Sequence, residues 1–273
     1  MCRWMAYTGN PVPLETLLFK SKHNLIDQSM SSRSAETPTN GDGFGVGWYG
    51  AREVPGLFRS IRPAWNDFNL RDLALQVDSR LFLAHVRATS MATVQETNCH
   101  PFRFGKWLFV HNGEIFGIEK MRRDLLLAID APLLENILGT TDSELMFHLA
   151  LTFGLTEDPL QALARMVGFI ERTGKQRGVD ESVWMTVGVS DGESIWAVRY
   201  ASDGKAPTLY HSRDMDDLSN MQPDLPDLLG EKARAIVSEP MGKFPQAWSA
   251  VPQASSVHVK AGELDLKPFA PLA

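Results

Sequence analysis

A cysteine follows the initiating methionine directly in the opening stretch MCRWMAYTG. Aminopeptidases that remove the first methionine accept small second residues, so Cys2 could become the first residue of the mature chain, with a thiol and a free α-amine on one carbon. An α-amine has a pKa of about 7.7 to 8.0 and could act as general base for that thiol. The alternative is a buried strand cysteine, because free cysteines are among the most buried residues. Position alone does not separate these interpretations.

An Asn-Gly pair follows an apolar run in the stretch FVHNGEIFG, residues 109–117. We expect a strand that ends in a sharp turn here. The Asn112 side-chain amide and the Gly113 backbone N–H could then point at one developing oxyanion, which suits acyl transfer. Without further context, Asn-Gly is simply a turn.

Two charged residues could bind the charged ends of an amino acid. Arg87 follows the apolar run RLFLAHV, and its planar guanidinium matches a carboxylate. Asp142 lies at a predicted helix start in GTTDSELMF, where the helix dipole also favours a carboxylate. Taken singly, a surface ion pair explains Arg87 and helix stabilisation explains Asp142.

Other chemistries lack their sequence patterns. The glycine-rich stretch NGDGFGVGWYG has neither the Gly-Lys-Ser/Thr ending nor the following helix of a phosphate loop, so we expect close backbone packing beside a site. The histidines lack metal-ligand spacing, and no metal site is predicted. We expect His85 and His111 to hydrogen-bond the backbone near the site, and Cys99 to be a small buried thiol.

The overall composition narrows the partners. The formal net charge is -6 and the isoelectric point is 5.7, whereas nucleic-acid-binding proteins usually carry a basic face, so nucleic acid is not an expected partner. No apolar run approaches the roughly 20 residues that span a membrane, and the N-terminus lacks a signal-peptide pattern. We therefore expect a cytoplasmic protein without membrane association, whose two cysteines remain free thiols.

The elements that must position these residues begin with strands. Strands are predicted from the N-terminus to a Gly-Asn-Pro turn at 9–11, and in FGVGWYG, RLFLAHVR and KWLFVHNG, which we expect to be adjacent in one sheet. The stretch PLETLLFKSKHNLIDQS has helical spacing. The polar, Gly-rich stretch that follows it, at about 30–43, predicts a mobile loop.

Two helices and further strands complete the order. One helix is predicted in TDSELMFHLALTFG, and a second in DPLQALARMVGFIERTG, with Pro159 in its first turn and Gly174 at its end. From residue 183 strands return, with a hairpin around Asp-Gly in VWMTVGVSDGESIWAVRY, then TLYHS, ARAIVSEP and SSVHVKAG. Strands, helices and strands in that order predict an α+β fold. The acidic, Pro-containing stretch near 213–230 is predicted to be a loop insertion.

Taken in order, several of these motifs resemble a known family. Cys2, HVR at 85–87, HPF at 100–102, HNGE at 111–114 and TDSE at 141–144 resemble the glutaminase domain of class II glutamine amidotransferases, which are N-terminal nucleophile hydrolases. The stretches MCRWMAYTG and NGDGFGVGWY are most similar to the compact single-domain branch with the YafJ-type amidotransferases and the ergothioneine-pathway amidohydrolases. The resemblance implies one glutaminase domain over 1–273, a four-layer αββα sandwich of two antiparallel sheets, and no cofactor.

The resemblance also implies catalytic roles. Cys2 would be the nucleophile, with its free amine as the base, while the Asn112 side chain and the Gly113 N–H would form the oxyanion hole. The thiolate would attack the γ-amide of glutamine or of a γ-glutamyl compound, and water would cleave the resulting thioester.

Substrate-binding roles follow from the same resemblance. Arg87 would bind the α-carboxylate of glutamine, Asp142 would bind its α-ammonium, and His100 would lie near the glutamine pocket. Larger relatives usually have an aromatic residue after this arginine and a Thr two residues further on. In this chain the sequence leaves open whether Thr89 or Ser90 supplies the hydroxyl.

The sequence also leaves alternatives for the function. Large members carry a synthase or isomerase domain that uses the ammonia. Here, either a partner enzyme accepts it or the protein is a free-standing hydrolase of γ-glutamyl amides. Two other classes remain: a catalytically silent glutamine-binding regulator, and an N-terminal Cys hydrolase of another amide. The physiological substrate and the oligomeric state are not encoded in any motif.

Overall fold

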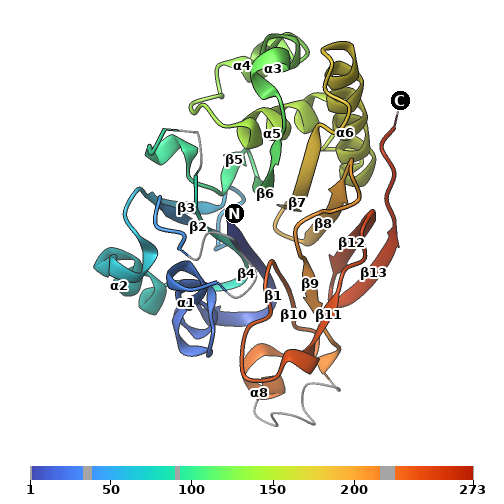
Figure 1. Cartoon of the computed structure of the whole chain (residues 1–273). Helices are drawn as coiled ribbons and strands as arrows, with labels where there is room; N and C mark the ends of the chain where they lie inside the picture. Colours follow the sequence, from blue (N-terminus) through green and yellow to red (C-terminus); the bar gives the residue numbers. More distant parts are fainter. Residues whose placement is uncertain (1, 33–38, 90–92, 216–224, 273) are drawn as a thin grey trace.

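Two antiparallel sheets make up the centre of the computed structural model, which describes residues 2–32, 39–89, 93–215 and 225–272 (Figure 1). The first sheet has the strand order β11-β9-β10-β1-β4-β2-β3. Its strands are β1 (Arg3–Pro13), β2 (Phe44–Trp48), β3 (Gly56–Ser60), β4 (Asp78–Val86), β9 (Tyr210–Ser212), β10 (Arg234–Val237) and β11 (Trp248–Ala250).

The second sheet has the strand order β13-β12-β8-β7-β6-β5. Its strands are β5 (Phe102–Phe104), β6 (Trp107–Ile115), β7 (Val183–Ser190), β8 (Ser194–Ala201), β12 (Ser255–Lys260) and β13 (Glu263–Pro268). β1, which directly follows the candidate nucleophile Cys2, and β6, which carries the candidate oxyanion donors, therefore belong to different sheets.

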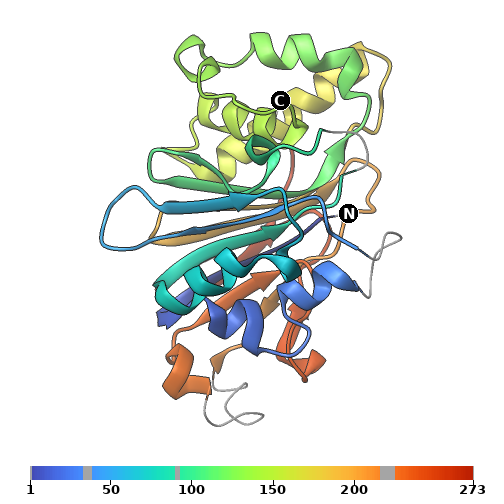
Figure 2. The same cartoon turned by 90° about the vertical axis from the view of Figure 1, so that its left-hand side faces the viewer.

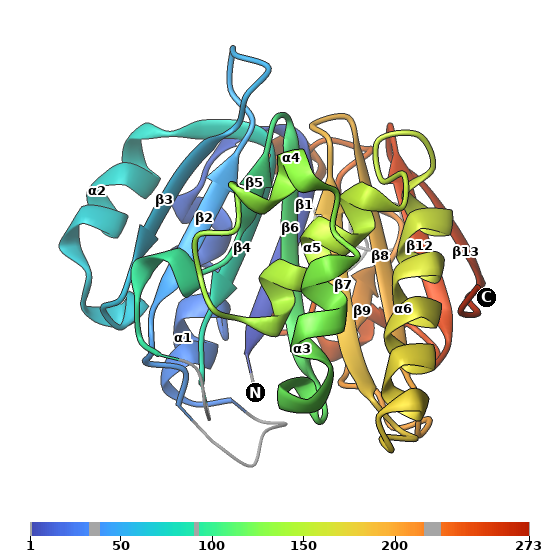
Figure 3. The ribbon, with the colours of Figure 1, turned by 90° about the horizontal axis from the view of Figure 1, so that it is seen from above.

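Helices cover the outer face of each sheet. The first sheet is covered by η1 (Thr16–Lys20), α1 (Leu25–Met30), η2 (Ala64–Asn66) and α2 (Phe68–Gln76). The second sheet is covered by α3 (Ile118–Leu127), α4 (Ala131–Leu134), α5 (Asp142–Thr152) and α6 (Pro159–Gln176), as Figure 3 shows for α5 and α6 over β7 and β8. The remaining short helices are η3 (Glu96–Asn98), α8 (Leu225–Leu229) and η4 (Pro245–Ala247).

Three apolar cores separate these four layers (Figure 2). Alternation along β1 fills two of them: Met5 and Tyr7 face the helices, whereas Trp4 and Ala6 face the other sheet. The arrangement is helices, sheet, sheet, helices, which confirms the predicted αββα sandwich. Within the described ranges, none of the helices has both the length and the apolar character that crossing a membrane requires.

Several local predictions are confirmed. Thr141 accepts a hydrogen bond from the Glu144 N–H at the start of α5, and Asp158 does the same for Gln161 at the start of α6. β7 and β8 form the predicted hairpin around Asp191-Gly192. α6 continues two residues beyond the predicted end at Gly174.

Two predicted turns are wrong, because strands pass through them. β1 continues through residues 9–11, and the shift in its pairing with β4 between Thr8 and Val12 accommodates the Gly-Asn-Pro sequence as an irregularity within the strand. β6 likewise runs through Asn112 and Gly113 to Ile115, paired with β7 throughout. The expectation that KWLFVHNG lies in one sheet with FGVGWYG and RLFLAHVR is also wrong, since β6 lies in the second sheet.

The predicted helix at 13–29 is divided in two. The first segment ends at Lys20, after which Ser21 is extended with φ −71° and ψ 146°, and His23 follows with a φ of +50° in the left-handed region. The Asn24 side chain then accepts a hydrogen bond from the Asp27 N–H and starts α1. The predicted mobile loop at about 30–43 and the predicted insertion at 213–230 lie partly outside the described residues, at 33–38 and 216–224.

Candidate active site

Cys2 and Asn112 lie on the facing sides of the two sheets. Cys2 precedes β1 and alternates with Trp4, which lies in the core between the sheets. On β6, Leu108 and Val110 belong to that core, so Asn112 points in the same direction as they do. The alternation of each strand therefore directs the candidate nucleophile and the candidate oxyanion donor toward one another.

Cys2 is a neighbour of Arg87 across the first sheet. Arg3 of β1 pairs with Val86 of β4, so the next position brings Cys2 beside Arg87. The Cys2 Sγ lies 3.4 Å from the Ala88 carbonyl oxygen and 3.5 Å from the Ala88 nitrogen. The thiol thus has both a hydrogen-bond acceptor and a hydrogen-bond donor at the end of β4.

The charges around Cys2 act on its thiol in opposite directions. Burial is the largest influence and raises the pKa of the Cys2 thiol. The Ala88 N–H and the Arg87 guanidinium lower this pKa, while the Asp142 carboxylate raises it. Arg87 and Asp142 are therefore both within electrostatic reach of the sulfur, and the thiol is predominantly protonated until a base removes its proton.

Arg87 is buried against the glycine-rich segment. Its main chain continues the β2–β4 ladder, because the Arg87 N–H donates to the Gly43 carbonyl at 2.8 Å and the Asp42 N–H donates to the Arg87 carbonyl at 3.0 Å. The guanidinium reaches the Asp42 and Thr93 carbonyl oxygens at 3.4 Å each. Only 3% of Arg87 is exposed, and these contacts are long enough to leave donor capacity for a carboxylate.

The glycines of this segment allow close packing, as predicted. A Cβ at Gly43 would lie 2.6 Å from the Cys99 Sγ, and a Cβ at Gly45 would lie 2.2 Å from the His100 carbonyl oxygen. Cys99 is fully buried, and burial raises the pKa of its thiol to about 11. Cys99 is therefore a packing residue beside the site, which confirms its sequence-based interpretation.

Asn112 and Gly113 are set on β6 by the strand itself. Asn112 is 2% exposed, and no partner is found for its Oδ1 within the described residues. Gly113 has a φ of +151°, and a Cβ there would lie 1.9 Å from the Trp184 carbonyl oxygen. Only glycine fits this position. The donor pair is thus placed by a distorted strand rather than by the predicted turn.

Asp142 is joined to the same end of β6. Its Oδ2 accepts a hydrogen bond from the Ile115 N–H at 2.8 Å, and its Oδ1 accepts from the Ser143 N–H at 2.7 Å. The carboxylate therefore ties the start of α5 to the strand two residues after Gly113. It is partly exposed, and its remaining lone pairs are available to a cation.

His111 and Ser143 strengthen that connection. The His111 Nε2 lies 3.3 Å from the Trp184 carbonyl oxygen, which can only accept, so this nitrogen carries the proton. Burial lowers the pKa of His111, so the ring is neutral. Its Nδ1 therefore accepts a hydrogen bond from the Ser143 hydroxyl, with 2.8 Å between Nδ1 and Oγ. Ser143 was not among the residues expected at the site from the sequence. Its position next to Asp142 at a helix start was the available signal.

The rings of His85 and His100 contact each other near Arg87, tilted by 34°. Their ring centroids are 4.1 Å apart, and neither nitrogen of His100 has a hydrogen-bond partner in the described ranges. Burial lowers the pKa of His85 to about 3 and brings the pKa of His100 well below its ordinary value, where the Arg87 charge adds to the effect. Both rings are therefore neutral, and His100 lies near the site with two polar atoms unpaired.

Two hydrogen bonds join the sheets next to these residues. The Trp4 indole N–H donates to the Thr186 Oγ1 at 3.0 Å, and the His85 Nε2–H donates to the His111 carbonyl oxygen at 3.2 Å. Trp4 is two residues from Cys2, and His85 is two residues from Arg87. The cross-sheet bonds therefore fix the separation between the first-sheet residues and the second-sheet donors.

A buried ion pair holds the main chain of Cys2 from the other face of the first sheet. The Arg3 Nη1 donates to the Cys2 carbonyl oxygen at 2.9 Å, and the Arg3 Nε contacts the Glu239 Oε2 at 3.2 Å. Ser32 donates to the same oxygen at 2.8 Å, and the His23 Nε2 lies 2.5 Å from the Glu239 Oε1. Sequence reasoning missed this group, because Arg3 and Glu239 are 236 positions apart.

The structure brings the predicted site residues to one end of the sandwich. The set comprises Cys2, Arg87, His100, Asn112, Gly113 and Asp142. It provides a thiol that can act as nucleophile, and a side-chain amide and a backbone N–H that can stabilise a developing oxyanion. It also provides a guanidinium that can bind a carboxylate and a carboxylate that can bind an ammonium. Within the described ranges, no cluster of three or more His, Cys, Asp or Glu residues has the geometry of a metal site. The main-chain N–H of Thr89 donates to the Asp42 Oδ2 at 2.9 Å, while Ser90 lies outside the described residues.

Comparisons with known proteins agree with this chemistry. The sequence profile of the glutamine amidotransferases class-II matches residues 22–265. A probable glutamine amidotransferase of Saccharomyces cerevisiae, DUG3, is 32% identical over 98% of this chain and 84% of its own length. A gamma-glutamyl-hercynylcysteine sulfoxide hydrolase of Mycolicibacterium smegmatis is 33% identical over 41% of this chain and 51% of its own length.

Solved structures show the same similarity in three dimensions. A glutamine aminotransferase class-II domain protein from Silicibacter pomeroyi superposes with a TM-score of 0.74, at 34% identity, over 99% of this chain and all of its own. A glutamine phosphoribosylpyrophosphate amidotransferase from B. subtilis superposes with a TM-score of 0.62 at 11% identity, over 99% of this chain and 49% of its own. This second likeness concerns the fold alone.

Proposed function

The chain belongs to the class II glutamine amidotransferases, and from that membership we propose that Cys2 is the nucleophile which opens the γ-amide of glutamine or of a γ-glutamyl compound. The observation that carries the proposal is the placement of Cys2 opposite Asn112, with Arg87 as its neighbour across the sheet. The protein is an enzyme of this family, and the roles of individual residues below are our proposal.

The first half of the reaction forms a thioester. After Met1 is removed, the free amine of Cys2 accepts the thiol proton, and the thiolate attacks the γ-carbonyl carbon. The π electrons of the carbonyl bond move to the oxygen, to which the Asn112 side chain and the Gly113 N–H donate hydrogen bonds. The tetrahedral intermediate collapses as the leaving nitrogen takes the proton from the Cys2 ammonium. Ammonia or an amine departs, and the γ-glutamyl group stays on sulfur.

The second half restores the enzyme. The Cys2 amine accepts a proton from water, and the hydroxide attacks the thioester carbonyl in the same oxyanion hole. Collapse of this intermediate expels the thiolate and releases glutamate. The thiolate then recovers its proton from the Cys2 ammonium. Arg87 would hold the α-carboxylate and Asp142 the α-ammonium in both halves, with His100 beside the pocket.

The nature of the leaving group is the open choice within this function. We propose that the chain works as one glutaminase domain over 1–273, in the cytoplasm, where its two thiols stay free. The Mycolicibacterium relative is named for hydrolysis of a γ-glutamyl compound, which supports release of an amine other than ammonia. With glutamine as the substrate, an ammonia-accepting partner enzyme would be needed.

The test combines mass spectrometry with a release assay. The intact mass should lack methionine and gain one adduct with a diazoketone analogue of glutamine, and Cys2→Ala should gain none. Glutamate release from glutamine and from γ-glutamyl peptides should then exceed release from simple acyl amides. A chain that keeps Met1 in its native cell, or an adduct that persists in Cys2→Ala, contradicts the mechanism. A preference for acyl amides contradicts only the substrate class.

A further inference from the structure

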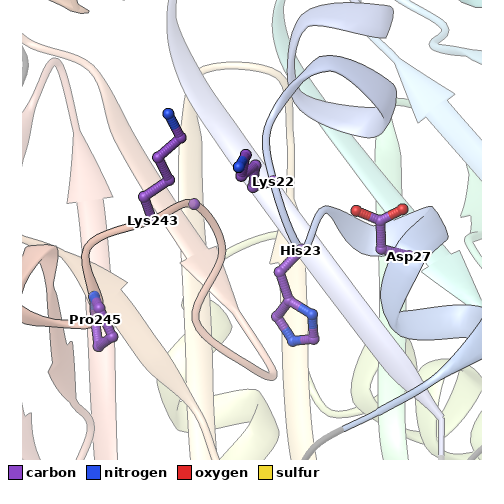
Figure 4. A pocket seen from close by; sticks show the side chains of 6 residues that line it. Lys22, His23, Asp27, Lys243 and Pro245 are labelled. Carbon is purple, nitrogen blue, oxygen red and sulfur yellow. The ribbon is translucent and has the colours of Figure 1, made fainter.

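A positively charged cavity lies on the other side of the nucleophile strand. It has a volume of about 490 Å³ and is lined by Lys22, His23, Asp27, Gly242, Lys243 and Pro245. Figure 4 shows Lys22 and His23 on the chain leading into α1, Asp27 on α1 itself, and Lys243 and Pro245 on the segment facing them. None of these residues belongs to the candidate active site.

The two segments are held together by their main chains. The Gly242 N–H donates to the Lys22 carbonyl at 2.6 Å. Gly242 has a φ of +83°, in the region that favours glycine, and His23 occupies the left-handed region without being a glycine. This backbone hydrogen bond therefore holds the segments that carry Lys22 and Lys243 next to each other.

The cavity carries an excess of positive charge. Neither Lys22 nor Lys243 pairs with a carboxylate within the described part of the chain, and Asp27 is the acidic residue in the lining. The Nδ1 of His23 makes no hydrogen bond to any described residue, since the contact to Glu239 uses Nε2. Two lysines and a histidine thus line a space large enough for a small molecule.

His23 also connects the cavity to Cys2. One oxygen of the buried Glu239 carboxylate contacts His23 and the other contacts Arg3 and Ser32, and Arg3 in turn donates to the Cys2 carbonyl oxygen. Arg3 is 2% exposed and Glu239 is 3% exposed, so water does not screen this chain of charges. The Cys2 carbonyl fixes the peptide plane next to the carbon that bears both the thiol and the amine.

We propose that this cavity binds a small anion with two negative charges, carried by phosphate or carboxylate groups, and that its occupancy is transmitted to Cys2 through His23, Glu239 and Arg3. The anion would pair with Lys22 and Lys243 and accept a hydrogen bond from the Nδ1–H of His23. For this contact the ring would take up a proton from water, so that one nitrogen donates to the anion and the other to the Glu239 carboxylate, which it would then hold more strongly. A stronger contact between Glu239 and His23 would change the ion pair between Glu239 and Arg3. Because Arg3 donates to the Cys2 carbonyl oxygen, the orientation of Cys2 would change with it.

Binding is tested by calorimetric titration of the Met1-processed protein with inorganic phosphate and with succinate, at constant ionic strength set by sodium chloride. The wild type should bind one of these anions at least tenfold more tightly than the double variant Lys22→Gln, Lys243→Gln. Lys120→Gln, which removes an exposed lysine from α3, should bind like the wild type. Equal binding by the double variant, or binding of neither anion by the wild type, overturns the site.

Transmission is tested by the rate at which iodoacetamide alkylates Cys2. Saturating anion should change this rate at least twofold in the wild type, and the modified peptide identifies Cys2 because Cys99 is fully buried. In His23→Asn the anion should still bind, but the rate should no longer respond, since Asn tolerates the left-handed backbone and lacks the ring. Thermal unfolding checks that each variant is folded. An unchanged wild-type rate at full occupancy overturns the transmission, and a response retained in His23→Asn overturns the route.

Discussion

The candidate active site has a first-sheet half, with Cys2 and Arg87, and a second-sheet half, with Asn112, Gly113 and Asp142. The two halves differ in the lengths of the hydrogen bonds that their polar groups make within the chain. In the second-sheet half, Asp142, His111 and Ser143 are joined by hydrogen bonds of 2.7 to 2.8 Å. In the first-sheet half, the Arg87 guanidinium has two contacts of 3.4 Å, and the Cys2 Sγ has two contacts of 3.4 and 3.5 Å. The Asp142 carboxylate is therefore held in place by the chain alone, whereas Asn112, whose Oδ1 has no partner in the described residues, and the nucleophile half keep hydrogen-bonding capacity for a substrate.

Removing the nucleophile should have the largest effect on kcat, because the first-sheet half then lacks its reacting group. Cys2→Ala should lower kcat for glutamine or γ-glutamyl peptide hydrolysis by at least about 1,000-fold, because no other group can form the thioester. Product release is measured by coupled glutamate detection. Cys99→Ala provides the matched control and should retain most activity. Full activity in Cys2→Ala would refute the covalent mechanism.

The second-sheet half should show a smaller and different loss. Asn112→Ala should reduce kcat by roughly 100 to 1,000-fold, with little change in KM, because the amide interacts with charge that develops only in the transition state. Steady-state kinetics measure both constants. Asn136→Ala, at an exposed position near α4, should leave both unchanged. A rise in KM with constant kcat would contradict oxyanion stabilisation by Asn112 and would indicate that this residue binds the substrate instead.

The hydrogen bond between the halves can be removed while all the proposed catalytic side chains are kept, although Thr186 also donates to the Asn112 carbonyl oxygen at 3.5 Å. Thr186→Val removes the acceptor of the buried Trp4 indole N–H and should lower the free energy of unfolding by about 1 to 3 kcal/mol. Activity should fall less than in Asn112→Ala, because the catalytic groups remain. Urea denaturation and kcat are measured together. Thr186→Ser keeps the hydroxyl and should recover both values, whereas a Ser variant as impaired as Val would point to packing instead.

The neutral histidines at the junction of the halves predict a pH dependence of stability. Burial holds the pKa of His85 at about 3 and lowers the pKa of His100 and His111. Below pH 6.5 the unfolded chain binds protons that the folded chain does not. The free energy of unfolding should therefore decrease as the pH falls, by up to about 1.4 kcal/mol per pH unit for each histidine. Urea denaturation at pH 7.5, 6 and 5 measures the slope, and a constant value contradicts the neutral assignment.

Local sequence signals predicted the elements whose ends are encoded nearby. Thr141 and Asp158 begin α5 and α6, and Asp191-Gly192 turns the chain between β7 and β8. The same kind of signal failed at Asn112-Gly113. There, pairing with β7 keeps the chain extended, and glycine supplies an unusual φ inside the strand. A turn residue therefore indicates backbone freedom, and the neighbouring strand decides how that freedom is used.

Contacts between distant residues were beyond sequence reasoning. The order of motifs indicated which residues would meet at the site, and Cys2 and Arg87 do lie side by side. It did not indicate that β1 and β6 lie in different sheets, that Trp4 reaches Thr186, or that Arg3 pairs with Glu239. These interactions depend on the packing of layers, for which a single sequence carries no periodic signal.

The position of Arg87 on the extended β2–β4 ladder has a thermodynamic consequence. A free arginine side chain loses about 2 kcal/mol of rotamer entropy when it is immobilised. Arg87 is already 3% exposed and held by the Asp42 and Thr93 carbonyls, so most of that loss has occurred on folding. The binding of a carboxylate there should therefore be favoured by enthalpy, with only a small entropic penalty from the protein.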